Sequence, residues 1–239
     1  MTKPALHVTA SPHIRAADDT PTIMWSVVMS LVPVVGASLY FFGPSALLVI
    51  LASCAGVLVV ERFFGAAGST SLGDGSAMIT GILLGLTLPP GFPLWMAFIG
   101  GAFGMAFGKL IFGGLGQNIF NPALLGRAFL QAAFPVAITT WSVPAENWLS
   151  LRGDNLALPL MSPTLADGMA GATPLGLMKF EQISTELLPL FLGSTGGSIG
   201  ETSTVLILLG GIYLAARNHL NWRIPVSIFL TVAVMAGGI

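Results

Sequence analysis

A hydroxyl on a run of very small residues is the feature of this chain that most suggests chemistry. The run is Asp167-Gly168-Met169-Ala170-Gly171-Ala172-Thr173, within the only long polar segment of the sequence. A threonine hydroxyl is a poor nucleophile without an adjacent base, and Asp167 is too far along a flexible chain to activate Thr173. Glycine and alanine allow close approach to the backbone. We therefore expect Thr173 to be modified by another enzyme, although the pattern alone also fits a simple surface turn.

Three charged residues are further candidates. Arg127 lies in a segment otherwise made mainly of Ala, Leu and Phe. A charge inside a membrane needs a partner or a wet cavity, so Arg127 either has a functional role or snorkels toward the nearby helix start. Asp74 and Glu201 are candidates for a cation path. Asp74 also fits an ordinary N-cap, and Glu201 fits an interfacial residue.

Several conventional sites are excluded by the residue pattern. No Ser/His/Asp arrangement, defined carboxylate pair or lysine-containing phosphate loop is found in the sequence. Its three histidines are scattered, which predicts no metal site. Cys54 is the only cysteine, so this chain alone holds no disulfide, cysteine zinc site or iron–sulfur cluster.

The composition is that of an integral membrane protein. Hydrophobic residues make up 54% of the 239 residues and charged residues only 8%, against about 25% charged residues in soluble domains. The net charge of -1 excludes an electrostatic surface for nucleic acid. About twenty polar residues precede the first apolar run, which excludes a cleavable signal peptide. The apolar stretch 225–239 stops without a polar exit, so we expect the chain to be incomplete at its C-terminus.

The elements that must position these residues are predicted to be transmembrane helices. Two segments, 77–88 and 122–134, are too short to span a bilayer and are interrupted by Gly or Pro, as in the half-helices that expose backbone groups to an ion or cofactor. Asp74-Gly75-Ser76 opens the first of them, and Gln117-Asn118 with Asn121-Pro122 opens the second; both also fit ordinary caps. The other predicted segments are 22–42, 44–60, 94–108, 198–216 and one that begins at Ile224.

Four regions follow from this pattern. Residues 1–20 form a cytoplasmic tail, and 21–138 hold five transmembrane segments. Residues 139–197 form an extracytoplasmic loop and re-entry, and 198–239 hold the sixth span and a truncated seventh. The predicted fold class is therefore all-α, a polytopic transmembrane helical protein with broken half-helices and one long extracytoplasmic loop.

The orientation follows from the positive-inside rule. With the N-terminus in the cytoplasm, Glu61-Arg62 and Lys109 close the second and fourth spans on the inside, and the short outside turns near Gly43 and Gly91 carry no basic residue. Thr173 then faces outward, which in a bacterium is the periplasmic side of the inner membrane. The inside segments hold Lys3, Arg15, Arg62, Lys109, Arg217 and Arg223.

The chain resembles the D subunit of the Rnf ion-translocating electron-transport complex and, more distantly, the B subunit of the Na+-translocating NADH:quinone reductase. The resemblance covers essentially the whole chain, and its motifs fall in the expected order. The matching stretches are Ser11-Pro12-His13, Asp74-Gly75-Ser76-Ala77 to Leu88-Pro89-Pro90, Gly113-Gly114-Leu115-Gly116-Gln117-Asn118 through Asn121-Pro122-Ala123, and Asp167-Gly168 with Ala172-Thr173-Pro174-Leu175.

The resemblance implies that Thr173 carries FMN through a phosphoester bond, installed from FAD by a flavin transferase. It implies a second flavin or riboflavin held without a covalent bond, and Asp74 near the cation path. Where this chain has Ala170, the family often has Ser or Thr, which bears on the efficiency of the transferase. In addition to Thr173, the candidate cofactor ligands are Asp167, Gly168, Ala172, Arg127, Asn118 and Asn121.

The predicted function is that of a membrane subunit of a redox-driven Na+ or H+ pump, a ferredoxin:NAD+ oxidoreductase of Rnf type, that is not catalytic alone. Its expected partners are the other membrane and peripheral subunits, the flavin transferase and the lipid bilayer. Two other classes fit the same broken helices: a transporter or channel without a redox role, and a structural membrane scaffold.

Overall fold

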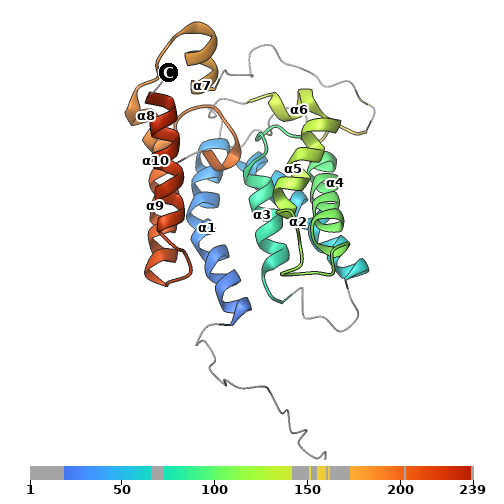
Figure 1. Ribbon diagram of the computed structural model, residues 1–239. Helices are drawn as coiled ribbons and strands as arrows, with labels where there is room; N and C mark the ends of the chain where they lie inside the picture. Colours follow the sequence, from blue (N-terminus) through green and yellow to red (C-terminus); the bar gives the residue numbers. More distant parts are fainter. Residues whose placement is uncertain are drawn as a thin grey trace, which may run out of the picture.

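The computed structural model describes residues 19–65, 73–141, 151, 155–159, 161, 173–201 and 203–237, and every regular element in these ranges is helical (Figure 1). This confirms the all-α prediction. The elements are α1 (Thr20–Phe42), α2 (Pro44–Phe64), α3 (Ser76–Leu86), α4 (Leu94–Met105), a π-helical turn η1 (Ala106–Leu110), α5 (Pro122–Ala133), α6 (Pro135–Thr139), α7 (Pro174–Gly176), a second π-helical turn η2 (Leu177–Glu181), α8 (Leu187–Leu192), a 3-10 turn η3 (Ile199–Glu201), α9 (Thr204–Ala216) and α10 (Arg223–Gly237).

The helices have the apolar character of a membrane protein. Both α1 and α2 are long and apolar enough to cross a bilayer, and α3, α9 and α10 are shorter apolar helices, as is α4 together with η1. With 11 and 12 residues, α3 and α5 extend about 17 and 18 Å at 1.5 Å per residue. A hydrocarbon core of about 30 Å is nearly twice that length. The predicted pair of half-length helices is therefore confirmed.

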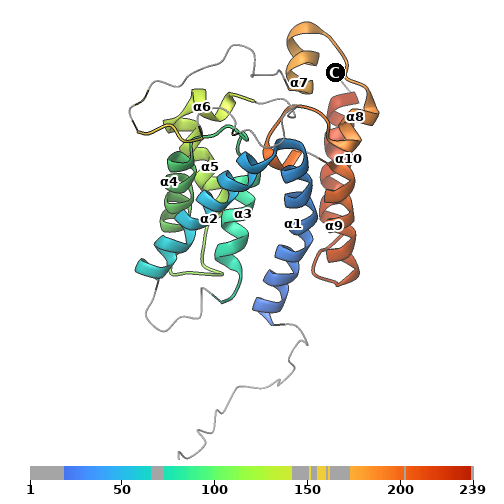
Figure 2. The same cartoon turned by 180° about the vertical axis from the view of Figure 1, so that it is seen from behind.

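A core of four helices positions these half-length elements. The most extensive contacts join α2 to α4, α2 to α3 and α4 to α5, while α1 packs beside them and carries α9 on its other side (Figures 1 and 2). Glycines let the backbones approach closely. A Cβ built on Gly56 would lie 2.0 Å from the Phe98 carbonyl oxygen, and one on Gly104 would lie 2.4 Å from that of Pro122. Small residues at helix interfaces are how membrane helices gain contact without a hydrophobic driving force.

The helices run between two ends of the molecule. One end, called here the basal end, holds the N-terminal ends of four helices, α1, α3, α5 and α10 (Figure 1). It also holds the C-terminal ends of α2, η1 and α9. The turns from α1 to α2 and from α3 to α4, together with α6 and α7, lie at the other, the apical end. Arg62, Lys109, Arg217 and Arg223 belong to elements that meet at the basal end. The chain thus alternates between the two ends in the order that the sequence predicts.

The sixth predicted span is shorter than expected. The helix α9 begins at Thr204, where Ser203 caps it, and residues 199–201 form a separate 3-10 turn. Ile199 donates its N–H to the Leu88 carbonyl, and a Cβ on Gly200 would lie 3.0 Å from the Leu86 carbonyl oxygen. The segment before α9 is therefore packed against the end of α3. Within the predicted span 198–216, the α-helix therefore begins only at Thr204, because Ile199 bonds to the end of α3 and not to a helical partner.

A buried asparagine fastens the long polar segment to the core. Asn155 is 1% exposed, and its Nδ2 donates to the carbonyls of Pro90 and Phe92, each at 3.0 Å. The main-chain carbonyl of Asn155 accepts the N–H of Leu94, the first residue of α4. Asn155 thereby provides hydrogen-bond partners for backbone groups of the turn between α3 and α4 and of the first residue of α4, which have no partner within a helix.

Replacing Asn155 with alanine is expected to loosen this attachment. The substitution leaves two carbonyls in a buried turn without their donors, at a cost of about 1–3 kcal/mol for a buried group left unpaired. Limited proteolysis of the membrane-embedded protein is expected to cut the N155A variant faster. Gln131→Ala, which removes an exposed amide from α5, is the matched control. Equal cleavage rates in both variants would show that Asn155 is not the attachment.

Candidate functional site

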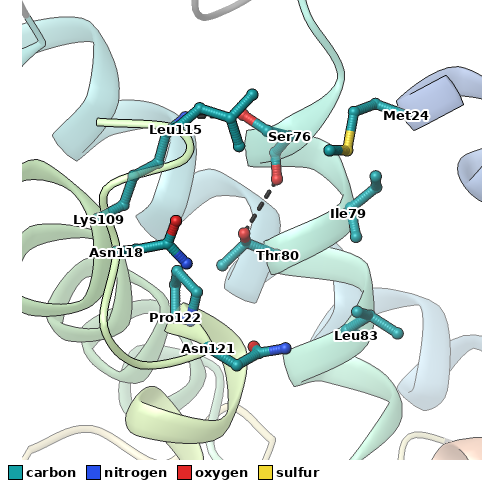
Figure 3. A pocket seen from close by; sticks show the side chains of 10 residues that line it. All are labelled: Met24, Ser76, Ile79, Thr80, Leu83, Lys109, Leu115, Asn118, Asn121 and Pro122. Carbon is teal, nitrogen blue, oxygen red and sulfur yellow. Dashed lines mark hydrogen bonds between the residues drawn. The ribbon is translucent and has the colours of Figure 1, made fainter. Parts of the chain in front are cut away.

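The starts of the two half-length helices meet at a small cavity at the basal end. Its volume is about 140 Å³. Figure 3 shows side chains from α1, α3, η1, the glycine-rich connection and α5 around it. Asn118 and Asn121, both predicted cofactor ligands, are among them. The lining residues are Met24, Ser76, Ile79, Thr80, Leu83, Lys109, Leu115, Asn118, Asn121 and Pro122.

The polar residues that open the two helices act as caps. Oδ1 of Asn121 accepts the N–H groups of Ala123 and Leu124, at 2.9 and 3.3 Å, and Pro122 is the first helical residue. This confirms the predicted N-cap. Asp74 accepts the N–H of Ser76 at 2.8 Å, while Gly75 with φ 79° occupies the N-cap position of α3. Asp74 therefore precedes the N-cap, so its interpretation as the N-cap residue is wrong although its carboxylate accepts the N–H of the first helical residue. Its role in a cation path stays a prediction.

A buried ion pair lies beside this cavity. Nζ of Lys109 lies 2.5 Å from Oε1 of Glu61 and donates to Oγ of Ser76 at 2.7 Å. The side chains of Lys109 and Glu61 are only 4% and 0% exposed. Three elements meet in this contact: the last turn of α2, the first residue of α3 and the π-helical turn η1. Lysine, glutamate and serine here form a charge-compensated polar centre within an apolar bundle.

This pair is not among the predicted site residues, because Glu61 and Lys109 were both interpreted as ends of spans. Lys109 does lie in the last turn of its helix, as predicted, but its side chain is buried. The helix continues through Lys109 as a π-helical turn, in which Ile111 donates to the carbonyl of Ala106. Such wide turns inside α-helices are frequent at functional sites. The signal in the sequence is the pair of opposite charges closing two spans that are both followed by glycine-rich connections.

Arg127 has a backbone partner away from this cavity. Its Nη1 donates to the carbonyl of Thr87 at 2.5 Å, and Thr87 is the C-cap of α3. A guanidinium at a helix C-terminus satisfies an orphan carbonyl and interacts favourably with the helix dipole. The contact gives the half-buried charge the partner that a membrane requires. The predicted role of Arg127 in binding a cofactor stays a prediction.

Thr173 lies at the other end of the molecule, at the start of α7 (Figure 1). The residue is half-buried, and its Oγ1 accepts the N–H of Gly176 at 3.2 Å. Glu201 is exposed, and its Oε2 accepts the N–H of Ser198 at 3.0 Å. The structure therefore places neither residue at the basal cavity. Asp167, Gly168 and Ala172, together with Ala170, lie outside the described residues.

The fold and the buried polar centre define an all-helical membrane protein with half-length helices. Its family is shown by sequence: the profile of the NQR2, RnfD, RnfE family matches residues 7–239, and the chain belongs to this family. The resemblance inferred from the motifs is thereby confirmed.

Three relatives illustrate the similarity. The chain is 40% identical to the D subunit of the proton-translocating ferredoxin:NAD(+) oxidoreductase complex of Clostridium ljungdahlii, over 95% of this chain and 67% of the relative. It is 41% identical to the D subunit of the ion-translocating oxidoreductase complex of Stutzerimonas stutzeri, over 93% of this chain and 67% of the relative. It is 36% identical to the D subunit of the Na(+)-translocating ferredoxin:NAD(+) oxidoreductase complex of Acetobacterium woodii, over 97% of this chain and 69% of the relative.

Proposed function

We propose that this chain is the D-type membrane subunit of an ion-translocating ferredoxin:NAD+ oxidoreductase. The observation that carries the proposal is the family match over residues 7–239, supported by relatives named as D subunits of such complexes. The protein acts with other membrane and peripheral subunits and is not catalytic alone. Relatives are named for both protons and sodium ions, so the family does not fix the cation.

The proposed cofactor is FMN, esterified to Thr173 by a flavin transferase. The geometry around Thr173 suits a covalently attached FMN. Its Oγ1 accepts a hydrogen bond from Gly176, and an ester oxygen keeps a lone pair for the same bond. Beyond it, Leu175, Met178 and Phe180 are 78%, 60% and 79% exposed and offer apolar surface to an isoalloxazine ring. Bound FMN supplies an electron relay, and the chain's task is to hold the ring and shield it from side reactions.

The basal cavity suits a small ion better than a second flavin. Its volume of about 140 Å³ is below the roughly 300–1,000 Å³ of small-molecule sites. A second, non-covalent flavin or riboflavin stays part of the proposal without an assigned site, and Asn118, Asn121 and Arg127 stay predicted cofactor ligands. Asp74 and Glu201 stay predicted members of the ion path.

The proposed location is the bacterial inner membrane, crossed several times, with the N-terminus in the cytoplasm and Thr173 on the periplasmic side. The basic residues that close or open helices at the basal end support this orientation, because cytoplasmic loops carry an excess of Lys and Arg. The basal cavity then faces the cytoplasm, and the proposed FMN on Thr173 faces the periplasm.

The flavin proposal is tested by the fluorescence of the denatured protein in a gel. Protein produced together with the flavin transferase is expected to fluoresce, and Thr173→Ala is expected to abolish the signal and the electron transfer of the assembled complex. Thr173→Ser, which keeps a hydroxyl, is the matched control and is expected to retain part of the signal.

Two outcomes would count against the flavin. An unmodified mass of the wild-type chain would favour a transporter or channel without a redox role. A T173A complex with normal electron transfer would favour a structural scaffold.

A further inference from the structure

The Glu61 carboxylate is incompletely satisfied. Its side chain is 0% exposed, its Oε1 contacts Lys109, and its Oε2 has no hydrogen-bond partner among the described residues. A buried charge is costly unless both pairing and hydrogen bonding are good. The centre therefore keeps one carboxylate oxygen available as a ligand.

Lys109 separates this carboxylate from the basal cavity. Lys109 and Ser76 line the cavity, whereas Glu61 is not among its lining residues. A cation that enters the cavity therefore meets the ammonium group and the serine hydroxyl before it can reach Glu61. The same cavity is lined by Asn118 and Thr80, whose amide and hydroxyl oxygens are possible acceptors for the ammonium group (Figure 3).

We propose that Lys109 is a tethered cation that occupies the Glu61 carboxylate until a transported monovalent cation replaces it. In the exchange, the ammonium group moves toward the cavity and the incoming cation binds the carboxylate together with Ser76 Oγ. A sodium ion leaves both charges of the pair in place and changes only the partner of the carboxylate, whereas a proton neutralises the carboxylate. The inference rests on the proposed ion translocation and deepens it by naming the site and its internal competitor.

The chemistry of lysine suits this role. Its ammonium is a compact charge on a flexible four-carbon stem, whereas the planar fork of arginine favours one fixed geometry. The position on a π-helical turn places this stem where helical hydrogen bonding is already irregular. A pair whose two partners lie on different helices can thus open without unfolding either helix.

The experiment uses the whole complex in proteoliposomes, with electron transfer and cation uptake measured together. Glu61→Gln and the double variant E61Q/K109Q are expected to lower the cations moved per electron at least about tenfold, within the 5- to 150-fold range typical of coupling between sites. Lys109→Gln is expected to raise the passive cation leak by a similar factor. Arg62→Gln, which changes the exposed neighbouring charge, is the control and is expected to leave the ratio unchanged.

The double variant is decisive because its two amides replace the pair without leaving a buried charge. If E61Q/K109Q moves cations with the wild-type ratio, the pair is only structural and the inference is overturned. Runs with and without sodium, and with a protonophore, identify the cation as Na+ or H+. Electron transfer without any cation movement in the wild-type complex would instead contradict the proposed function itself.

Discussion

Replacing Lys109 with methionine is expected to destabilise the protein by about 3–5 kcal/mol, the usual cost of removing one partner from a buried ion pair. The loss arises because the Glu61 side chain is 0% exposed and its Oε1 is paired with Lys109. Ser76 Oγ loses its ammonium donor in the same variant. The thermal midpoint of the purified complex and the amount of this protein in the membrane measure the effect.

The matched comparison is the double variant Glu61→Leu with Lys109→Met. Replacing a whole buried pair by apolar residues of similar volume is often neutral or stabilising. The double variant is therefore expected to recover most of the stability that K109M loses. A double variant as unstable as K109M would show that the packing around the pair, and not its charge balance, is what the single substitution disturbs.

Substitutions of the Lys109–Glu61 pair are thus expected to affect stability and cation transport differently. An uncharged pair is expected to restore the fold but not the coupling of cations to electrons. If Glu61 and Lys109 only joined α2 to η1, one substitution pattern would rescue both properties. The start of α3 completes this contact, because its first residue, Ser76, accepts a hydrogen bond from Lys109 Nζ at 2.7 Å.

The sequence predicted the helices better than the polar centre. The half-helices could be foreseen because Gly75 and Asn121-Pro122 are local start signals, and each acts within its own turn. The pairing of Glu61 with Lys109 joins residues 48 positions apart and depends on a π-helical turn that no local propensity specifies. Asn155 was missed for the same reason, since its partners belong to the distant turn between α3 and α4. Thr173 could be singled out because its signal is a short contiguous pattern.

Replacing Gly56 with alanine is expected to be among the most damaging changes in the helical core. The added Cβ would lie 2.0 Å from the Phe98 carbonyl oxygen and 2.9 Å from its carbon, so the backbones of α2 and α4 must separate. Overpacking of a well-packed core costs about 1–3 kcal/mol, and occasionally more. We expect the upper end of this range or beyond, because the clash is with backbone and not with a side chain that can change rotamer.

Gly36→Ala is the matched control, since a Cβ at Gly36 of α1 meets nothing within 4 Å. Alanine there is expected to be neutral or stabilising by up to about 1 kcal/mol, because glycine is the poorer residue in a helix interior. Both variants make the same chemical change inside an apolar helix, so a difference in thermal midpoint reports the α2–α4 contact alone. Equal midpoints would mean that these two helices are not held as closely as the structure shows. The Lys109–Glu61 pair would then lose the rigid frame on which its burial depends.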